Sequence, residues 1–330
     1  MSDFRIIGAG SPLVDYTAEI DDTFLPEHLP GIKGGTVHID DQERDRIVAA
    51  LNGNLLKTPG GAAANTIAAL GRMGVAAAFF GKLGHDENGE FFRRELGGDG
   101  VDTGYLLTGS GSTGYCISLV TPDAERTMRS NLGVSIALES ADWQECDFSG
   151  FNWLLSEGYM LQIAGFETIF DCARKSGCSV ALDLSSIEIA RQKQDTLPQL
   201  LKQKVDLLFC NNDEAAALTG NDSPERNIEI LASYVPAAVV KLGAAGSLIK
   251  SGDSPLIRIP AFDFGKAVDT TAAGDHFAAG FFYALARNKT LEKCGVCGSI
   301  LGGAAAAVKG SRLTPEMWQR VFTVIEQQSG

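Results

Sequence analysis

Two acidic residues that bracket a run of small residues form the sharpest candidate site in the sequence. The segment reads Asp269-Thr-Thr-Ala-Ala-Gly-Asp275 and leads into a largely apolar run that ends near position 286. Small residues at 272–274 let the backbone turn tightly and point successive N–H groups outward, and the helix expected next adds its positive dipole end. This pattern predicts an anion pocket with Asp275 beside it, placed to take a proton from an alcohol that attacks a bound phosphate. Aspartate is also a favoured N-cap, so helix capping is the alternative for Asp275.

A glycine pair followed by an asparagine predicts a second site. Gly60 and Gly61 precede a helix expected over 62–73, and Asn65 lies one turn inside it. Two glycines let a ligand approach the backbone closely, while the Asn amide can donate to and accept from vicinal hydroxyls. The alternative is ordinary helix initiation. Asp15, beyond the first predicted strand, is a further acidic candidate whose alternative is a turn aspartate.

Polar residues also follow predicted strands farther along the chain. An acid just past a strand end, at the carboxyl edge of a parallel sheet, is where α/β folds gather ligands. Strands expected at 205–210 and 237–242 are each followed by candidate ligand residues, and Asp183, in a strand expected at 179–184, is a weaker candidate. For the residues after the strand at 205–210, the alternative role is helix capping. The candidates are Asn211 and Glu214 after one strand, and Lys241, Gly243 and Gly246 after the other.

Several side chains keep two interpretations. Lys241 either pairs with a phosphate as a point charge or reaches solvent. Arg126 and Arg129 suit phosphate or carboxylate groups, and solvation at the surface is their alternative. Met128 and Tyr16 are candidates for touching a substrate, and a stacked aromatic ring would favour a nucleoside over a bare sugar.

The chain resembles the ribokinase-like (PfkB) carbohydrate kinase family, which includes adenosine kinases, over nearly its full length. Residues 269–280 look like the family's C-terminal signature, and residues 60–65 look like its N-terminal one. The family often has Gly where this chain has Ala272. If that position is left-handed, alanine carries about 1 kcal/mol of strain.

The resemblance implies a role for each candidate and a requirement for ATP and Mg²⁺. Asp269 is implied as a ligand of a monovalent cation such as K⁺, a requirement that stays open. By resemblance, the catalytic group is Asp275 with the amides of Ala272, Ala273 and Gly274; the substrate ligands are Asp15, Gly60, Gly61 and Asn65; the nucleotide residues are Asn211, Glu214, Lys241, Gly243 and Gly246, with Glu214 acting on hydrated Mg²⁺.

Alternating strands and helices must position these residues. Short apolar runs near 4–7, 77–80 and 153–156 alternate with helical stretches, and this rhythm continues to 242. Crossover connections of this kind require a mainly parallel sheet covered on both faces. Segments 11–40 and 103–130 break the rhythm with strand-like runs. We expect one kinase domain over 1–330, an α/β ribokinase-like three-layer sandwich whose small β-sheet lid comes from those two segments.

Composition narrows the function further. The 330 residues carry 28 basic and 41 acidic side chains, a net charge of −13 that argues against nucleic acid as a partner. No uncharged apolar stretch reaches the roughly 18 residues of a membrane span. Seven irregularly spaced cysteines favour a reducing compartment, so we expect a cytoplasmic protein in which Cys294 and Cys297 are packing residues. Exposed lid edges invite a homodimer, although nothing in the sequence determines the oligomeric state.

The sequence lacks the complete motifs of two other enzyme classes, the dinucleotide-dependent dehydrogenases and the Walker-type NTPases. Gly8-Ala-Gly10 begins a dinucleotide fingerprint, but Leu13 stands where its third glycine belongs. No Walker sequence occurs, since Gly81-Lys82 is followed by leucine. The sequence therefore predicts an ATP-dependent kinase that phosphorylates a hydroxymethyl oxygen of a sugar. A nucleoside is the alternative substrate, and a sensor that binds either ligand without turnover is the remote alternative.

Overall fold

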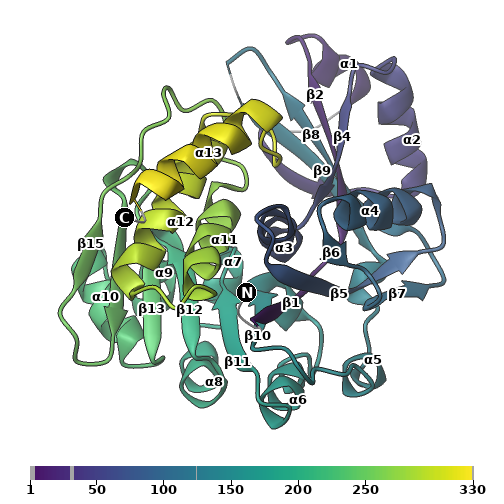
Figure 1. The fold of residues 1–330 in the computed structure, drawn as a ribbon. Coiled ribbons are helices and arrows are strands. Elements are labelled where there is room, and N and C mark those ends of the chain that lie inside the picture. The colour runs from purple at the N-terminus through teal and green to yellow at the C-terminus, as the bar shows by residue number, and fades with distance from the viewer. Residues whose placement is uncertain (1–3, 30–32, 124, 329–330) are drawn as a thin grey trace.

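Two β-sheets organise the chain (Figure 1). The computed structural model describes residues 4–29, 33–123 and 125–328. Apolar runs such as 207–210 and 237–240 suit strands that are buried on both faces. From edge to edge the larger sheet runs β15 (Ile257–Ile259), β14 (Ser247–Ser251), β13 (Ala237–Lys241), β12 (Leu207–Asn211), β11 (Ser179–Asp183), β10 (Trp153–Glu157), β1 (Arg5–Ala9), β5 (Ala76–Gly84) and β6 (Val101–Asp102), with β7 (Leu106–Gly109) also beside β5.

The larger sheet is parallel except at one edge. The strands from β13 to β6 pair in parallel, as does β7 with β5, whereas β14 and β15 add as antiparallel strands. Because parallel strands point the same way, the chain leaves most of them at one carboxyl edge. The residues predicted to bind ligand after β11, β12 and β13 therefore meet along that edge.

Helices cover both faces of this sheet and create two cores. Neighbouring residues Ile6 and Ile7 of β1 are both fully buried, and they belong to different hydrophobic clusters. This arrangement confirms the predicted three-layer α/β sandwich. One face carries α3 (Ala62–Arg72), α4 (Glu87–Gly98), α11 (Ala273–Leu285), α12 (Leu291–Ala306) and α13 (Pro315–Gln328); the other carries α5 (Ser140–Gln144), α6 (Thr168–Lys175), α7 (Ile187–Gln192), α8 (Leu197–Lys204), α9 (Asn212–Thr219) and α10 (Pro224–Ala232).

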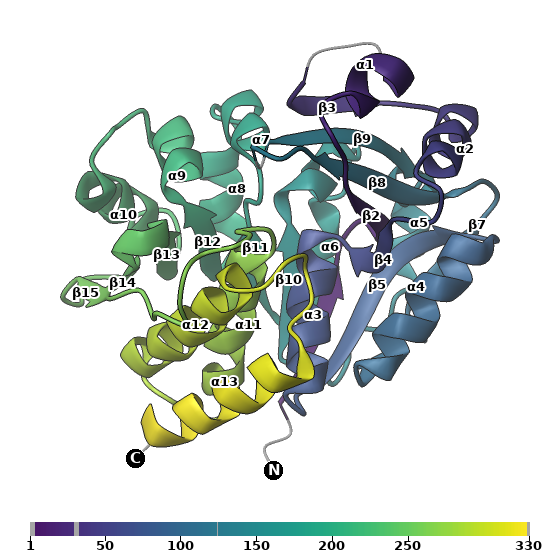
Figure 2. The same cartoon turned by 90° about the horizontal axis from the view of Figure 1, so that it is seen from above.

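The smaller sheet stands beside the carboxyl edge of the larger one (Figure 2). Its order is β3 (Gly35–His38), β9 (Arg126–Gly133), β8 (Thr113–Val120), β2 (Leu13–Glu19) and β4 (Leu56–Gly60). The predicted lid segments, 11–40 and 103–130, do not coincide with it. The sheet also takes in β4 and the end of β9, whereas β7, which lies within 103–130, pairs with β5 of the larger sheet. Alternation alone did not reveal β4, because Pro59 and Gly60 are poor strand formers.

The two faces of the smaller sheet differ in chemistry. Arg126 reaches Asp269 beside α11, so we call the face that carries Arg126 the inner face. Tyr16 lies on the opposite face, where its hydroxyl donates to Asn88 Oδ1 at 2.6 Å, and the prediction that Tyr16 touches substrate is wrong. The described strand register places on the inner face Asp15, Thr17, His38, Cys116, Ser118, Met128 and Ser130.

The cysteine pair lies in the core. Cys294 and Cys297 are buried in α12 within the cluster on the α11 face, which confirms packing as their role. Over the described ranges, no helix combines the length and the apolar character needed to cross a membrane. Strands β3 and β4 form the edges of the smaller sheet, and a homodimer through this sheet stays a prediction.

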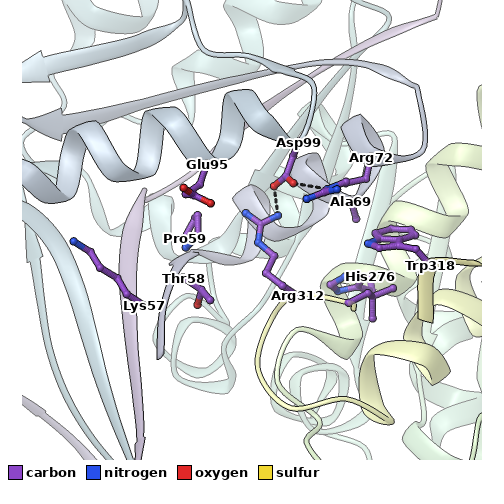
Figure 3. A pocket seen from close by; sticks show the side chains of 11 residues that line it. Lys57, Thr58, Pro59, Ala69, Arg72, Glu95, Asp99, His276, Arg312 and Trp318 are labelled. Carbon is purple, nitrogen blue, oxygen red and sulfur yellow. Dashed lines mark hydrogen bonds and ion pairs between the residues drawn. The ribbon is translucent and has the colours of Figure 1, made fainter. Parts of the chain in front are cut away.

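A shared carboxylate ties three helical elements together. Asp99, which follows α4, accepts from Arg72 Nε of α3 at 2.6 Å and also from Arg312, which precedes α13. Figure 3 shows Asp99 between the two guanidinium groups, at one side of a cavity of about 110 Å³ that also borders His276 and Trp318. Asp99 is 7% exposed, so its charge depends on these partners.

Replacement of Asp99 should test how much this ion-pair triad contributes. Asp99→Asn leaves Arg312 with most of its side chain buried and without its counter-charge, so we expect the free energy of unfolding to fall by about 3 kcal/mol. Arg72→Met is the matched control: the Arg72 side chain is 55% exposed, and its loss should cost less than about 1 kcal/mol. Urea unfolding measures both. Equal losses of unfolding free energy in the two variants would contradict a larger contribution from the buried pair of Asp99 and Arg312.

Candidate active site

The N-terminus of α11 has the geometry of an anion pocket. Ala272 is its N-cap and lies in the left-handed region with φ of 57°, so the strain anticipated for alanine is present. The Ala273 N–H donates to the Thr270 carbonyl at 3.2 Å. Of the amides predicted to hold an anion, Ala273 is therefore already engaged. The N–H groups of Gly274 and Asp275 belong to the first turn, where a helix supplies no acceptor of its own.

Asp275 lies against α3. Its Oδ2 accepts from Asn65 Nδ2 at 2.9 Å, and its backbone carbonyl accepts from Thr66 Oγ1 at 3.0 Å. Burial raises the pKa of Asp275 to about 7, a value suited to a base that works near neutral pH. The other amide atom, Asn65 Oδ1, is buried without a hydrogen-bond partner among the described residues. A hydroxyl donor from a ligand would satisfy that oxygen.

Lys241 lies beside the same helix terminus. Its Nζ donates to Asp183 Oδ2 at 2.7 Å, and a Cβ built on Gly274 would lie 3.0 Å from that ammonium. Burial opposes the charge, but the carboxylates of Asp183 and Glu214 prevail and raise the pKa of Lys241 to about 12. The side chain is 14% exposed, so the solvent alternative for Lys241 is wrong. Asp183, the weaker candidate, is part of this group.

Asn211 and Glu214 form a reciprocal cap at the start of α9. Asn211 Oδ1 accepts from the Glu214 N–H at 2.8 Å, while the two Glu214 oxygens accept from the backbone and side-chain nitrogens of Asn211, both at 2.9 Å. The capping alternative is therefore confirmed for this pair. Burial, followed by the negative charge of Asp183, raises the pKa of Glu214 to about 7. With both oxygens engaged, Glu214 fits contact with a metal through water.

A cavity of about 570 Å³ brings the predicted nucleotide turn and the anion pocket together. Gly243 and Gly246 have φ of 58° and 89°, and a Cβ on Gly246 would lie 2.0 Å from the Ile259 carbonyl oxygen. This size suits a nucleotide-sized ligand. Part of the lining of this cavity was not predicted from the sequence. The small residues on one face of α12 were the one feature of the sequence that could have indicated it. The missed residues are Phe262, Phe264, Ser299, Gly302, Gly303 and Ala306.

The four predicted substrate residues also come together. A Cβ on Gly60 would lie 2.2 Å from Asp15 Oδ2, and one on Gly61, whose φ is 102°, would lie 2.4 Å from the Ser11 carbonyl oxygen. These contacts explain both glycines, because any side chain would collide with a polar group. Burial raises the pKa of Asp15 to about 6. Asn65 then connects this group to Asp275.

Asp269 contacts Arg126 of the smaller sheet. Arg126 Nη2 donates to Asp269 Oδ2 at 2.6 Å, and the Gly310 and Thr271 N–H groups donate to its two oxygens at 2.9 Å each. Burial alone would raise the pKa of Asp269, but these donors and the Arg126 charge hold it below its usual range. Two of these three donors fall on Oδ2 and one on Oδ1, and a role of Asp269 toward K⁺ stays a prediction. Arg129 is 3% exposed and bonds to the Met128 carbonyl, outside this cluster.

Comparison with known proteins agrees with this geometry. A model described as pfkB family carbohydrate kinase matches residues 35–317. The chain is 29% identical to an ATP-dependent ribose-1-phosphate kinase of Halopiger xanaduensis, covering 78% of this chain and 83% of that protein. It is 26% identical to a ribokinase of Haemophilus influenzae, covering 81% of this chain and 87% of that protein.

A solved structure extends the likeness over the whole fold. The structure described as adenosine kinase from Sinorhizobium meliloti superposes with a TM-score of 0.82 at 28% identity, covering 98% of this chain and 100% of that one. The chain is therefore similar to sugar kinases in sequence and to an adenosine kinase in fold. The chain belongs to the pfkB family of carbohydrate kinases and is a phosphotransferase that acts on an alcohol group of a sugar or nucleoside.

Proposed function

We propose that the protein transfers the γ-phosphoryl group of ATP to a hydroxymethyl oxygen of a sugar. The observation that carries this proposal is the contact between Asn65 and Asp275. One amide atom of Asn65 orients the carboxylate, while the other, Oδ1, is buried and lacks a hydrogen-bond partner among the described residues, so a substrate hydroxyl that reached it would satisfy it. The base and the substrate ligand are therefore linked by one side chain, at the entrance to the helix whose amides receive the phosphate.

Each group then has a defined task. Asp15 and Asn65 hold the sugar hydroxyls, and Asp275 accepts the proton of the attacking alcohol. The N–H groups of Gly274 and Asp275, with the Lys241 ammonium alongside, stabilise the charge on the transferring group. Gly243 and Gly246 leave room for the nucleotide. Mg²⁺, when bound, neutralises phosphate oxygens, and Glu214 would act on its hydration shell.

The chemistry of the inner face favours a sugar over a nucleoside. Its side chains are mostly small and polar, with hydroxyls at Thr17, Ser118 and Ser130 beside the carboxylate of Asp15. Such groups match the hydroxyls of a sugar better than the flat surface of a base. The aromatic residue that would support base stacking, Tyr16, points to the other face. A nucleoside remains the second candidate, because Met128 lies on the inner face.

We further propose that the smaller sheet acts as the lid of a single kinase domain. Arg126–Asp269 and Lys309–Glu19 connect it to the larger part across the opening of the site. A lid in this place would exclude water from the transferring phosphoryl group.

Removing the base should strongly slow turnover without abolishing binding. We expect Asp275→Asn to lower kcat by about 10²–10⁴-fold with little change in the KM for sugar, because the amide keeps its shape but cannot take a proton. ADP release in a coupled assay measures both constants. Asp253→Asn, at an exposed turn, is the control and should retain the normal rate. A near-normal kcat for Asp275→Asn would remove Asp275 as the base.

The pH dependence should report the raised pKa of the base. Asp275 must be ionised to act, and burial raises its pKa to about 7, so kcat/KM should rise as pH increases through about 7 and level off above it. Glu157 and Glu214 titrate in the same range, so the apparent value belongs to the coupled group. A profile that is flat between about pH 5.5 and 8 would contradict this assignment.

A substrate panel should decide between the two acceptor classes. We expect ADP release to be fastest, as kcat/KM, with one of ribose, fructose or a related ketose, and slower with adenosine, inosine and guanosine. If a nucleoside were the best acceptor, the proposal of a sugar substrate would be wrong, while the proposal of phosphoryl transfer would stand. Binding measured by calorimetry without turnover on any acceptor would instead indicate the sensor.

A further inference from the structure

Glu157 is a buried acid with no role in the function described so far. It ends β10, is 2% exposed, and belongs to the strand next to β1. Its Oε1 accepts from the Ser11 N–H at 2.9 Å, and its Oε2 accepts from the Ala63 N–H at 2.8 Å. One carboxylate thus holds two backbone segments that lie 146 and 94 residues away in the sequence.

Both segments carry the residues that are expected to bind sugar. Ser11 lies in the loop that leads into β2, four residues before Asp15. Ala63 lies in the first turn of α3, two residues after Gly61 and two residues before Asn65. Helix α3 contacts both β10 of the large sheet and β4 of the smaller one, and Figure 2 shows the smaller sheet, which includes β2, beside this edge of the large sheet.

The residues packed around Glu157 restrict where its carboxylate can lie. A Cβ on Gly10 would lie 2.9 Å from Glu157 Oε2, so the chain has no side chain there. The negative charge also faces the N-terminus of α3, where a helix favours an anion. Each oxygen accepts one backbone N–H, so both oxygens of the acid are engaged by the chain itself.

We propose that Glu157 is a positioning residue whose carboxylate sets the spacing between the Asp15 loop and the Asn65 helix, and thereby aligns the sugar with Asp275. The connection to chemistry runs through Asn65, which donates to Asp275 Oδ2. Loosening the start of α3 would move Asn65 with respect to the base. Glu157 is not among the residues that line the cavity at Gly243 and Gly246, so we expect the geometry of the nucleotide turn to stay unchanged. This inference rests on the proposed function.

Two variants test the inference from opposite sides of one hydrogen bond. Glu157→Gln keeps the shape but replaces one acceptor by an NH₂ group, which faces a backbone N–H donor. Ala63→Pro removes the N–H itself at a first-turn position where a helix tolerates proline. For each folded variant we expect kcat to fall about tenfold and the KM for sugar to rise about tenfold, while the KM for ATP changes less than twofold. Glu188→Gln, an exposed acid on α7, is the matched control and should resemble the wild type.

The split between the two KM values separates positioning from mere stability. A general loss of stability would lower the amount of active enzyme without changing the KM for sugar alone. Wild-type constants in either folded variant, or equal rises in both KM values, would overturn the proposal.

Hydrogen exchange provides a measurement that needs no turnover. In Glu157→Gln, amides over 9–16 and 60–68 should exchange at least tenfold faster than in the wild type, whereas those over 243–249 should not change. Unchanged exchange over the first two segments would refute the positioning role. Absence of kinase activity in the wild type would refute the proposed function alone, because the exchange result still decides the role of Glu157.

Discussion

The interaction on which the site depends is the ion pair between Lys241 and Asp183, buried at the carboxyl edge of the large sheet. Glu214 and Asp275 add two more carboxylates within reach of this ammonium. Without Lys241, the negative charges would face one another in a region that solvates them poorly. A Cβ at position 274 would approach Nζ to 3.0 Å, so the glycine there lets the ammonium lie close to the start of α11 without a shift. The Gly-Asp sequence at the start of α11 therefore combines close packing against Lys241 with an electrostatic contact.

Concentrating acids in this way carries a stability cost that depends on pH. Burial raises the pKa of Asp15 to about 6 and that of Glu157 to about 7, and Glu214 and Asp275 behave similarly. Between the ordinary carboxyl range near pH 4 and about pH 7, the folded chain keeps protons that the unfolded chain releases. Stability contributed by these groups therefore falls as pH rises through that window and stays lower above it. At neutral pH and above, ionisation of these buried acids therefore lowers the free energy of unfolding.

Much of this site was predictable because local rules apply to it. Strand-end logic located Asp183, Asn211 and Lys241, and small residues before a helix located Asp275. The sequence could not say that Lys241 turns inward, because that depends on an acid 58 residues away. Nor could it place Tyr16, since strand alternation gives two faces without saying which one meets the substrate. Glu157 ends a strand as Asp183 does, but its partners become neighbours only through the fold.

The smaller sheet is held unequally at its two ends. At the rim, Lys309–Glu19 joins side chains that are 43% and 73% exposed, so water screens this contact and it contributes little. Arg126–Asp269 differs, because its two side chains are 32% and 8% exposed, and opening the rim requires this partly buried pair to separate. At the base, the connections from β1 to β2 and from β4 to α3 are fixed by hydrogen bonds to the buried Glu157. In the proposed lid movement the contacts at the base would stay while Arg126 and Asp269 separate, so the rim would open with Asp15 and Asn65 still near Asp275. A substrate would then enter without displacing the residues proposed to align it.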